Sequence, residues 1–181
     1  MPDPAVRIRR LRALGMIALR APLDDAAVAG DAAAALGLAA APEVRRVARV
    51  GTRAAAWMSP DEWLVLCPPE ETGDLCAVLS AVLAGRPRLV AEVSDARAAF
   101  SVEGPGARAT LAKGAPADLS PAAFRPGAVR RTRLGQVAAA ILMEAEAPED
   151  RLTGLAARSV AEHVALWLQR AAQPGRLPRG F

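Results

Sequence analysis

The segment AEVSDARAAFSVEGPGARATLAKGAPADLSPAAFRPG, residues 91–127, decides how this chain is organised. Its pattern predicts a strand, a glycine turn, a short helix and then a loop with several prolines that ends at Phe124-Arg125-Pro126-Gly127. The sequence before it has the pattern of one small α/β layer, and the sequence after it has the pattern of a second. We therefore predict that residues 91–127 join two halves of one fold.

Length and composition agree with this division. A chain of 181 residues that is 52% hydrophobic can form one compact domain, or two fused half-domains, without a metal or disulfide to stabilise it. We expect a flexible N-terminal arm at residues 1–13, a single globular domain at 14–172 and a C-terminal tail at 173–181. The two half-domains are predicted at about 14–93 and 94–172.

The first half has alternating strand and helix signals. Strands are predicted at 16–20, 44–50, 54–58, 63–67 and 88–93, with a turn at Ser59-Pro60-Asp61-Glu62. One helix is capped by Asp24 or Asp25 and ends at Gly37, and a second runs over 69–84. The order is the β-α-β-β-α-β order of ferredoxin-like folds.

The second half has a related order. A strand at 98–102 is followed by a short helix led by Pro105, a hairpin formed by 129–134 and 137–143, and a further strand at 151–157. A capping box at Ser159–Glu162 opens the last helix, whose buried stripe includes Val164, Trp167 and Leu168. The predicted class is α+β, with two fused ferredoxin-like halves.

Charge and residue usage argue against several classes of function. The formal charge is +4, but only 3% of residues are aromatic, and proteins that grip single-stranded nucleic acid need aromatic side chains for stacking. Two cysteines without a CxxC spacing are typical of reduced thiols in a cytoplasmic protein. No window approaches 18 strongly apolar residues. We expect no nucleic acid and no membrane among the partners.

Few residues have the pattern of a catalytic, cofactor or metal site. His163 is the sole histidine, and we expect it to be partly buried on a helix flank. Gly104-Pro105-Gly106-Ala107-Arg108-Ala109 fits the outline of a dinucleotide-binding turn, but a two-turn helix that begins with proline favours a simple strand-to-helix turn. From the sequence we assign no catalytic residue, no cofactor-binding residue and no metal ligand.

A polar cluster at Ser94-Asp95-Ala96-Arg97 opens the strand between the halves. Asp95 and Arg97 could pair with each other and fix the crossover, or Arg97 could face a partner or an anionic ligand. Trp57 and Trp63 lie on either side of the hairpin turn and favour a core position, although tryptophan is also enriched at interfaces.

Three blocks of sequence together resemble the gamma subunit family of heterotetrameric sarcosine oxidase. They are AAWMSPDEWLVLCP, then EVSDARAAFSVEGPGARATLAKGAPADLSPAAFRPGAVRRTRLGQVAAAI, then RSVAEHVALWL. The likeness runs from about residue 14 to 167. The candidate interface or signature residues in these blocks are Trp57, Trp63, Ser94, Asp95, Arg97, Phe124 and Arg158.

The resemblance implies a fold similar to the folate-binding domain of glycine-cleavage aminomethyltransferases. It also implies an assembly with alpha, beta and delta subunits that converts sarcosine to glycine, a one-carbon unit (formaldehyde or methylene-tetrahydrofolate) and hydrogen peroxide. FAD, FMN, NAD and zinc would belong to the other subunits and tetrahydrofolate to the assembly. This chain would bind no cofactor by itself.

The sequence departs from the family pattern at two places. The family often has Ser-His where this chain has Ser94-Asp95, and Gly-Cys where it has Gly114-Ala115. The missing histidine and thiol argue against a catalytic role for this region, so the expected role is assembly. The alternative is a stand-alone folate-binding or aminomethyltransferase-like protein, and a nucleic-acid adaptor that uses the arginine clusters is a third hypothesis.

Overall fold

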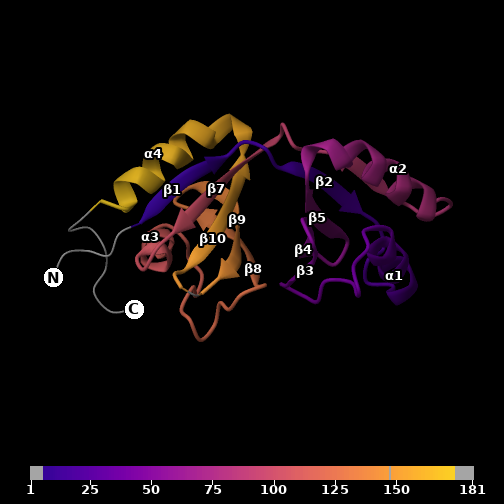
Figure 1. Cartoon of the computed structure of the whole chain (residues 1–181), viewed down its shortest axis with the longest axis horizontal. Coiled ribbons are helices and arrows are strands. Elements are labelled where there is room, and N and C mark those ends of the chain that lie inside the picture. Colours follow the sequence, from indigo (N-terminus) through magenta and orange to yellow (C-terminus); the bar gives the residue numbers. More distant parts are fainter. Residues whose placement is uncertain (1–5, 147, 174–181) are drawn as a thin grey trace. The chain divides into compact units, whose positions relative to one another are not determined.

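The computed structural model describes residues 6–146 and 148–173, and the chain divides into two compact units (Figure 1). Unit 1 comprises Met1–Arg12 with Asp95–Phe181, and unit 2 comprises Ala13–Ser94. Each unit contains its own antiparallel five-stranded sheet. None of the helices in the described ranges is long and apolar enough to cross a membrane.

Unit 2 contains the helices and strands predicted for the first half, and it has one strand more than the β-α-β-β-α-β order. Its elements are β2 (Gly15–Arg20), α1 (Ala26–Ala35), β3 (Val47–Val50), β4 (Arg53–Ser59), β5 (Glu62–Cys67), a 3-10 turn at Pro69–Glu71, α2 (Thr72–Val82) and β6 (Leu89–Glu92). The sheet order is β3-β4-β5-β2-β6. Without β3, this is the ferredoxin-like arrangement, in which the first strand of the motif lies between the third and the fourth. β3 extends the sheet at one edge.

Unit 1 contains a related but modified sheet. Its elements are β1 (Arg7–Leu11), β7 (Arg97–Glu103), α3 (Ala107–Ala112), β8 (Val129–Leu134), β9 (Val137–Ala145), β10 (Arg151–Ala157), a 3-10 turn at Arg158–Val160 and α4 (Ala161–Ala171). The sheet order is β1-β7-β10-β9-β8. The extra strand β10 lies between β7 and β9, and the start of the chain supplies the strand on the far side of β7.

The predicted N-terminal arm needs correction. Residues Arg7–Leu11 are not a flexible arm but form β1, which pairs with β7 from Arg7↔Glu103 to Leu11↔Ala99. Ile8 packs against the core of unit 1, and the side chain of Arg9 donates to Glu103 at 2.9 Å. The sequence of this edge strand, RIRRL, contains so many arginines that it does not have the alternation of apolar and polar residues that predicts a strand. Residues 1–5 and the predicted tail from 174 onward lie outside the described residues.

The core of unit 2 lies between its sheet and its two helices. Ile17, Leu19 and Val65 of the sheet pack with Val28 of α1 and Leu79 of α2. The predicted stripe of α2 is narrower than expected, since Val78 and Val82 are 44% and 40% exposed. The buried apolar side chains repeat every four residues, namely Leu75 and Leu79 of the helix and Leu83 at its C-cap.

The helix caps confirm one prediction and correct another. Asp25 caps α1, because its carboxylate accepts the N–H groups of Ala27 at 2.8 Å and Val28 at 3.2 Å. The predicted capping box at α4 does not form. A 3-10 turn comes before that helix, and no side chain caps it. Glu162 instead accepts a hydrogen bond from Arg10 of β1 at 2.7 Å.

A close contact between α4 and the loop after α3 requires a glycine. A Cβ atom at Gly114 would lie 2.5 Å from a ring carbon of Trp167 and 2.9 Å from the backbone nitrogen of Gly135. That nitrogen donates a hydrogen bond to the Gly114 carbonyl at 2.9 Å. The indole therefore packs directly on the backbone, although Trp167 is only partly buried.

We predict opposite effects for two glycine-to-alanine substitutions. Gly114→Ala should lower the free energy of unfolding by about 1–3 kcal/mol, because neither the rigid indole nor the backbone of Gly135 can easily move. Gly30→Ala should raise it by up to about 1 kcal/mol, because Gly30 lies on the exposed side of α1 with nothing within 4 Å of its Cβ position. Urea unfolding of both variants checks the pair. Equal effects would contradict the packing described above.

Candidate functional site

Arg108 is the most buried charged side chain in the described part of unit 1, with 4% of its surface exposed. Its Nη1 donates to the carbonyl oxygens of Leu119 at 2.8 Å and Phe124 at 2.7 Å. Its Nε donates to Asp150 at 3.0 Å, and its Nη2 donates to Glu146 at 2.9 Å. The guanidinium thus joins α3 to the loop before β8 and to the connection between β9 and β10.

This arrangement stabilises the fold of unit 1 and is not a ligand site. All three nitrogens of the guanidinium are occupied by groups of the same unit, and both carboxylates approach from one connection. This role of Arg108 was not predicted from the sequence. The arginine stands in an apolar helix, ARATLA, where a charge is unexpected, and that is the one signal in the sequence that could have indicated it.

The glycines before Arg108 form a tight turn. The Ala107 N–H donates to the Gly104 carbonyl at 3.0 Å, and Gly104 has φ +119°, a conformation that favours glycine. The α3 helix that follows is only six residues long. The structure therefore agrees with the strand-to-helix turn rather than with a dinucleotide-binding turn.

Phe124, a predicted signature residue, lies in the core. Its ring is fully buried, and the guanidinium carbon of Arg130 lies 5.1 Å from the ring centroid. Its carbonyl oxygen accepts the hydrogen bond from Arg108. Both contacts fix the loop that leads into β8, so the position of Phe124 is explained without a partner.

The polar cluster at residues 94–97 is divided between the two units. In unit 2, Ser94 Oγ accepts the Met16 N–H at 3.0 Å and lies 3.0 Å from a carboxylate oxygen of Glu92. In unit 1, Asp95 pairs with Arg158 rather than with Arg97. The side chain of Asp95 is 96% exposed, and exposed ion pairs stabilise a fold little. Within this part of the predicted set, the structure thus brings together Asp95 and Arg158.

The two hairpin tryptophans are directly opposite each other on β4 and β5. Trp63 is 1% exposed, and Trp57 is partly buried against the core of unit 2. The turn between the strands contains only Pro60 and Asp61, which is shorter than the predicted four-residue turn. A core position is therefore sufficient to explain Trp63.

The potential nucleophiles are not activated. Burial raises the pKa of the Cys67 thiol to about 11, and it also raises the pKa of Cys76. His163 is exposed on α4 rather than partly buried as predicted, because the buried face of that helix is formed by other residues, including Val164 and Leu168. In residues 6–146 and 148–173, no group of three or more His, Cys, Asp or Glu residues could hold a metal ion.

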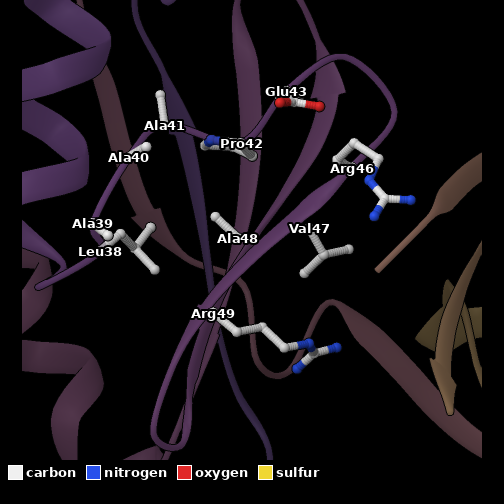
Figure 2. A pocket seen from close by; sticks show the side chains of 10 residues that line it. All are labelled: Leu38, Ala39, Ala40, Ala41, Pro42, Glu43, Arg46, Val47, Ala48 and Arg49. Atoms are coloured by element: carbon white, nitrogen blue, oxygen red, sulfur yellow. The ribbon is translucent and has the colours of Figure 1, made fainter. Parts of the chain in front are cut away.

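One open hollow in unit 2 has a volume of about 330 Å³ (Figure 2). Small apolar residues of the segment after α1 line one side, including Ala39, Ala40 and Ala41. The guanidinium groups of Arg46 and Arg49 extend away from these alanines. A small-molecule site needs several polar groups that converge on the ligand. Because the arginines point outward, this hollow lacks that arrangement.

A family model for the sarcosine oxidase gamma subunit matches residues 20–174. The chain belongs to the sarcosine oxidase gamma subunit family. It is 34% identical to the sarcosine oxidase subunit gamma of an Arthrobacter species over 134 residues, and this match covers 74% of this chain. It is 32% identical over 168 residues to that of Corynebacterium sp. strain U-96, which covers 92% of this chain.

The relatives extend beyond the matched region. The chain spans 64% of the length of the Arthrobacter relative and 78% of the strain U-96 relative. A third relative, from Corynebacterium sp. strain P-1, is 37% identical over 84 residues, which is 46% of this chain and 40% of that protein.

Solved structures agree with the family assignment. A chain of heterotetrameric sarcosine oxidase from Corynebacterium sp. U-96, in complex with pyrrole 2-carboxylate, matches with a TM-score of 0.83 and 29% identity. The match covers 92% of this chain and 83% of that chain. Aminomethyltransferase T from Bartonella henselae matches with a TM-score of 0.65 and 15% identity over 91% of this chain and 45% of that one. This second match confirms the predicted aminomethyltransferase-like fold.

We predict that Arg108→Ala lowers the free energy of unfolding by about 3–5 kcal/mol. The substitution leaves Glu146 and Asp150 without their buried counter-charge and removes the donor to two carbonyls of the loop. Arg125→Ala, at an exposed position of the same loop, should change it by less than about 0.5 kcal/mol. Chemical denaturation of both variants measures the difference. A small loss of unfolding free energy in the Arg108→Ala variant would show that the loop does not depend on Arg108.

We also predict that Cys67 is protected in the folded chain. In a Cys76→Ala variant, a thiol reagent should modify Cys67 only as fast as the protein opens, because the thiol is buried and its pKa is about 11. Between pH 9 and 11 the unfolded thiol loses its proton first, so stability should fall as the pH rises. Rapid labelling at pH 8 would contradict the burial.

Proposed function

We propose that this chain is the small gamma subunit of a heterotetrameric sarcosine oxidase, with alpha, beta and delta subunits as its partners. The observation that carries the proposal is the 0.83 TM-score match, at 29% identity, to a chain of such an enzyme. The family model, which matches residues 20–174, supports it independently of the structure.

The proposed role is assembly and stabilisation of the complex rather than catalysis. The fold of each unit explains its buried polar groups. They are the guanidinium of Arg108, its paired carboxylates Glu146 and Asp150, and the protonated thiol of Cys67. The complex would oxidise sarcosine in the cytoplasm to glycine and a one-carbon unit, with molecular oxygen as the oxidant that is reduced to hydrogen peroxide. FAD, FMN, NAD and zinc would be held by the other subunits.

Tetrahydrofolate would act at the level of the assembly, and one carboxylate-lined hollow of unit 1 does not fit it. A hollow near β1 and β10 contains the carboxylates of Glu103, Glu149 and Asp150, but its volume is about 140 Å³. Pockets for ligands of this size span roughly 300–1,000 Å³. Arg7 and Arg9 pair with Glu103, Arg7 also pairs with Glu149, and Arg108 pairs with Asp150. No carboxylate there is available to recognise a pterin.

Expression with and without genes for the alpha, beta and delta subunits tests the proposal. We expect an affinity tag on this chain to recover three further subunits and a flavin absorbance spectrum when the genes are co-expressed. The tagged chain expressed alone should bind no flavin. A chain that stays monomeric during co-expression and never recovers a flavoprotein would contradict the proposal.

The alternative of a stand-alone folate-binding or aminomethyltransferase-like protein requires a separate test. The fold match to aminomethyltransferase T is the observation that favours it. Calorimetry of the isolated chain with tetrahydrofolate should give no binding heat under the gamma-subunit proposal. Saturable binding by the isolated chain would favour the alternative.

A further inference from the structure

Helix α2 has a wide apolar stripe, and the fold of unit 2 buries only part of it. The stripe has the spacing i, i+3, i+4, i+7, i+8 that is typical of a helix face packed against a core, and its members are Leu75, Val78, Leu79, Val82 and, at the C-cap, Leu83. The three leucines are buried. Val78 and Val82 are 44% and 40% exposed. One side of the stripe therefore has no cover within unit 2.

The residues beside the two valines extend this apolar surface. Ala77 and Ala81 are exposed, and Asp74 is exposed one turn before Val78. Residues three and four positions apart lie on the same face of a helix. These five residues therefore form one surface, which we call the outer α2 face. Its apolar side chains are all short, so a second helix can approach its backbone closely.

The corresponding helix of unit 1 has a different outer side. The exposed residues of α4 include Glu162, His163, Gln169 and Arg170, with Leu166 as a single large apolar residue among them. A mainly polar outer side is usual for a helix on a solvated surface. The outer α2 face has one charged residue among four apolar ones. Its composition is typical of a helix face that is buried against another element.

The charge on the outer α2 face is negative and has no counter-charge nearby. Glu70 is exposed one turn before Asp74, in the 3-10 turn that leads into α2. Among residues 6–146 and 148–173, neither carboxylate has an ion-pair partner. Asp31 of the neighbouring helix α1, by contrast, pairs with Arg86 at 2.7 Å. Residues 70–85 contain no lysine or arginine, so a cation for Asp74 would have to come from elsewhere.

We propose that the outer α2 face is a docking surface for a helix of a partner subunit. That helix has apolar side chains three or four residues apart, which pack on the two valines, and a lysine or arginine that binds Asp74. Charge complementarity favours this occupant. A second copy of α2 brings no cation, and an anionic membrane surface is repelled by Glu70 and Asp74. The inference rests on the proposed function, because it needs a partner subunit.

The first test removes methyl groups from the face in the co-expressed complex. V78A/V82A should reduce the partner subunits recovered with this chain by about tenfold, because apolar contacts at the interface are lost. The urea midpoint of the isolated variant should not fall, since the valines are exposed and alanine has the higher helix propensity. L166A is the matched control, because Leu166 is 46% exposed on α4, and it should leave recovery unchanged.

The second test reverses the charge of the face. D74K should reduce recovery several-fold at low ionic strength, and the difference from the wild type should shrink as the salt concentration rises. D24K is the matched control, since Asp24 is an exposed carboxylate of unit 2 in the turn before α1. It should recover wild-type amounts. Equal losses in D74K and D24K would overturn a specific pairing of Asp74 with a cation of the partner.

The third test identifies the occupant. A photocrosslinking amino acid is placed at position 84, an exposed alanine directly after the C-cap of α2. Under the proposal, it joins this chain to a peptide of another subunit that has the apolar spacing and a lysine or arginine. A cross-link to a second copy of this chain, or a dimer of the isolated chain that V78A/V82A dissociates, would overturn the partner helix.

The failures of the two ideas are separable. If the wild-type chain recovers no subunits, the proposed function is wrong, and the docking surface falls with it. If the wild type and V78A/V82A recover the subunits equally well, the docking surface alone is wrong. A V78A/V82A variant that loses both recovery and urea midpoint would assign the two valines to the fold of unit 2 and would also overturn the docking surface.

Discussion

Unit 1 depends on one buried charge, the guanidinium of Arg108. A buried arginine without partners would cost several kcal/mol, so its position is tolerable only because two carboxylates and two carbonyl oxygens surround it. Those acceptors come from the loop before β8 and from the connection between β9 and β10. The same contact therefore sets the path of both segments.

The loop before β8 follows from this constraint. Arg108 holds the carbonyl of Phe124, and the ring of Phe124 in turn lies beneath Arg130. The contact between Trp167 and Gly114 fixes the start of the same loop, where no Cβ atom fits. A segment rich in proline and alanine, with little side-chain area to bury, thus acquires a defined path. That path leads directly into the arginine-rich edge strand, so one buried arginine positions the exposed ones.

The sequence was sufficient for the elements whose signals are local. The cap of α1, predicted as Asp24 or Asp25, the hairpin at Pro60-Asp61 and the helices and strands of unit 2 depend on neighbouring residues, and their patterns predicted them. The role of β1 was not predictable in this way, because its partner β7 lies about ninety residues later in the chain. Arg108 was missed for the same reason: its four acceptors are 11 to 42 residues away, and spacing alone does not bring them together. The predicted capping box at α4 does not form, because its glutamate, Glu162, accepts a hydrogen bond from Arg10, which is also distant in sequence.

Under the proposed function, this chain is a structural subunit that acts through its surfaces. Native mass spectrometry of the co-expressed, purified assembly tests that claim most directly. We expect a species that contains this chain together with three different subunits, from which the chain dissociates as a bare polypeptide at its sequence mass. A chain that leaves the assembly with a flavin, a folate or a metal ion attached, or that is found only outside it, would contradict the account.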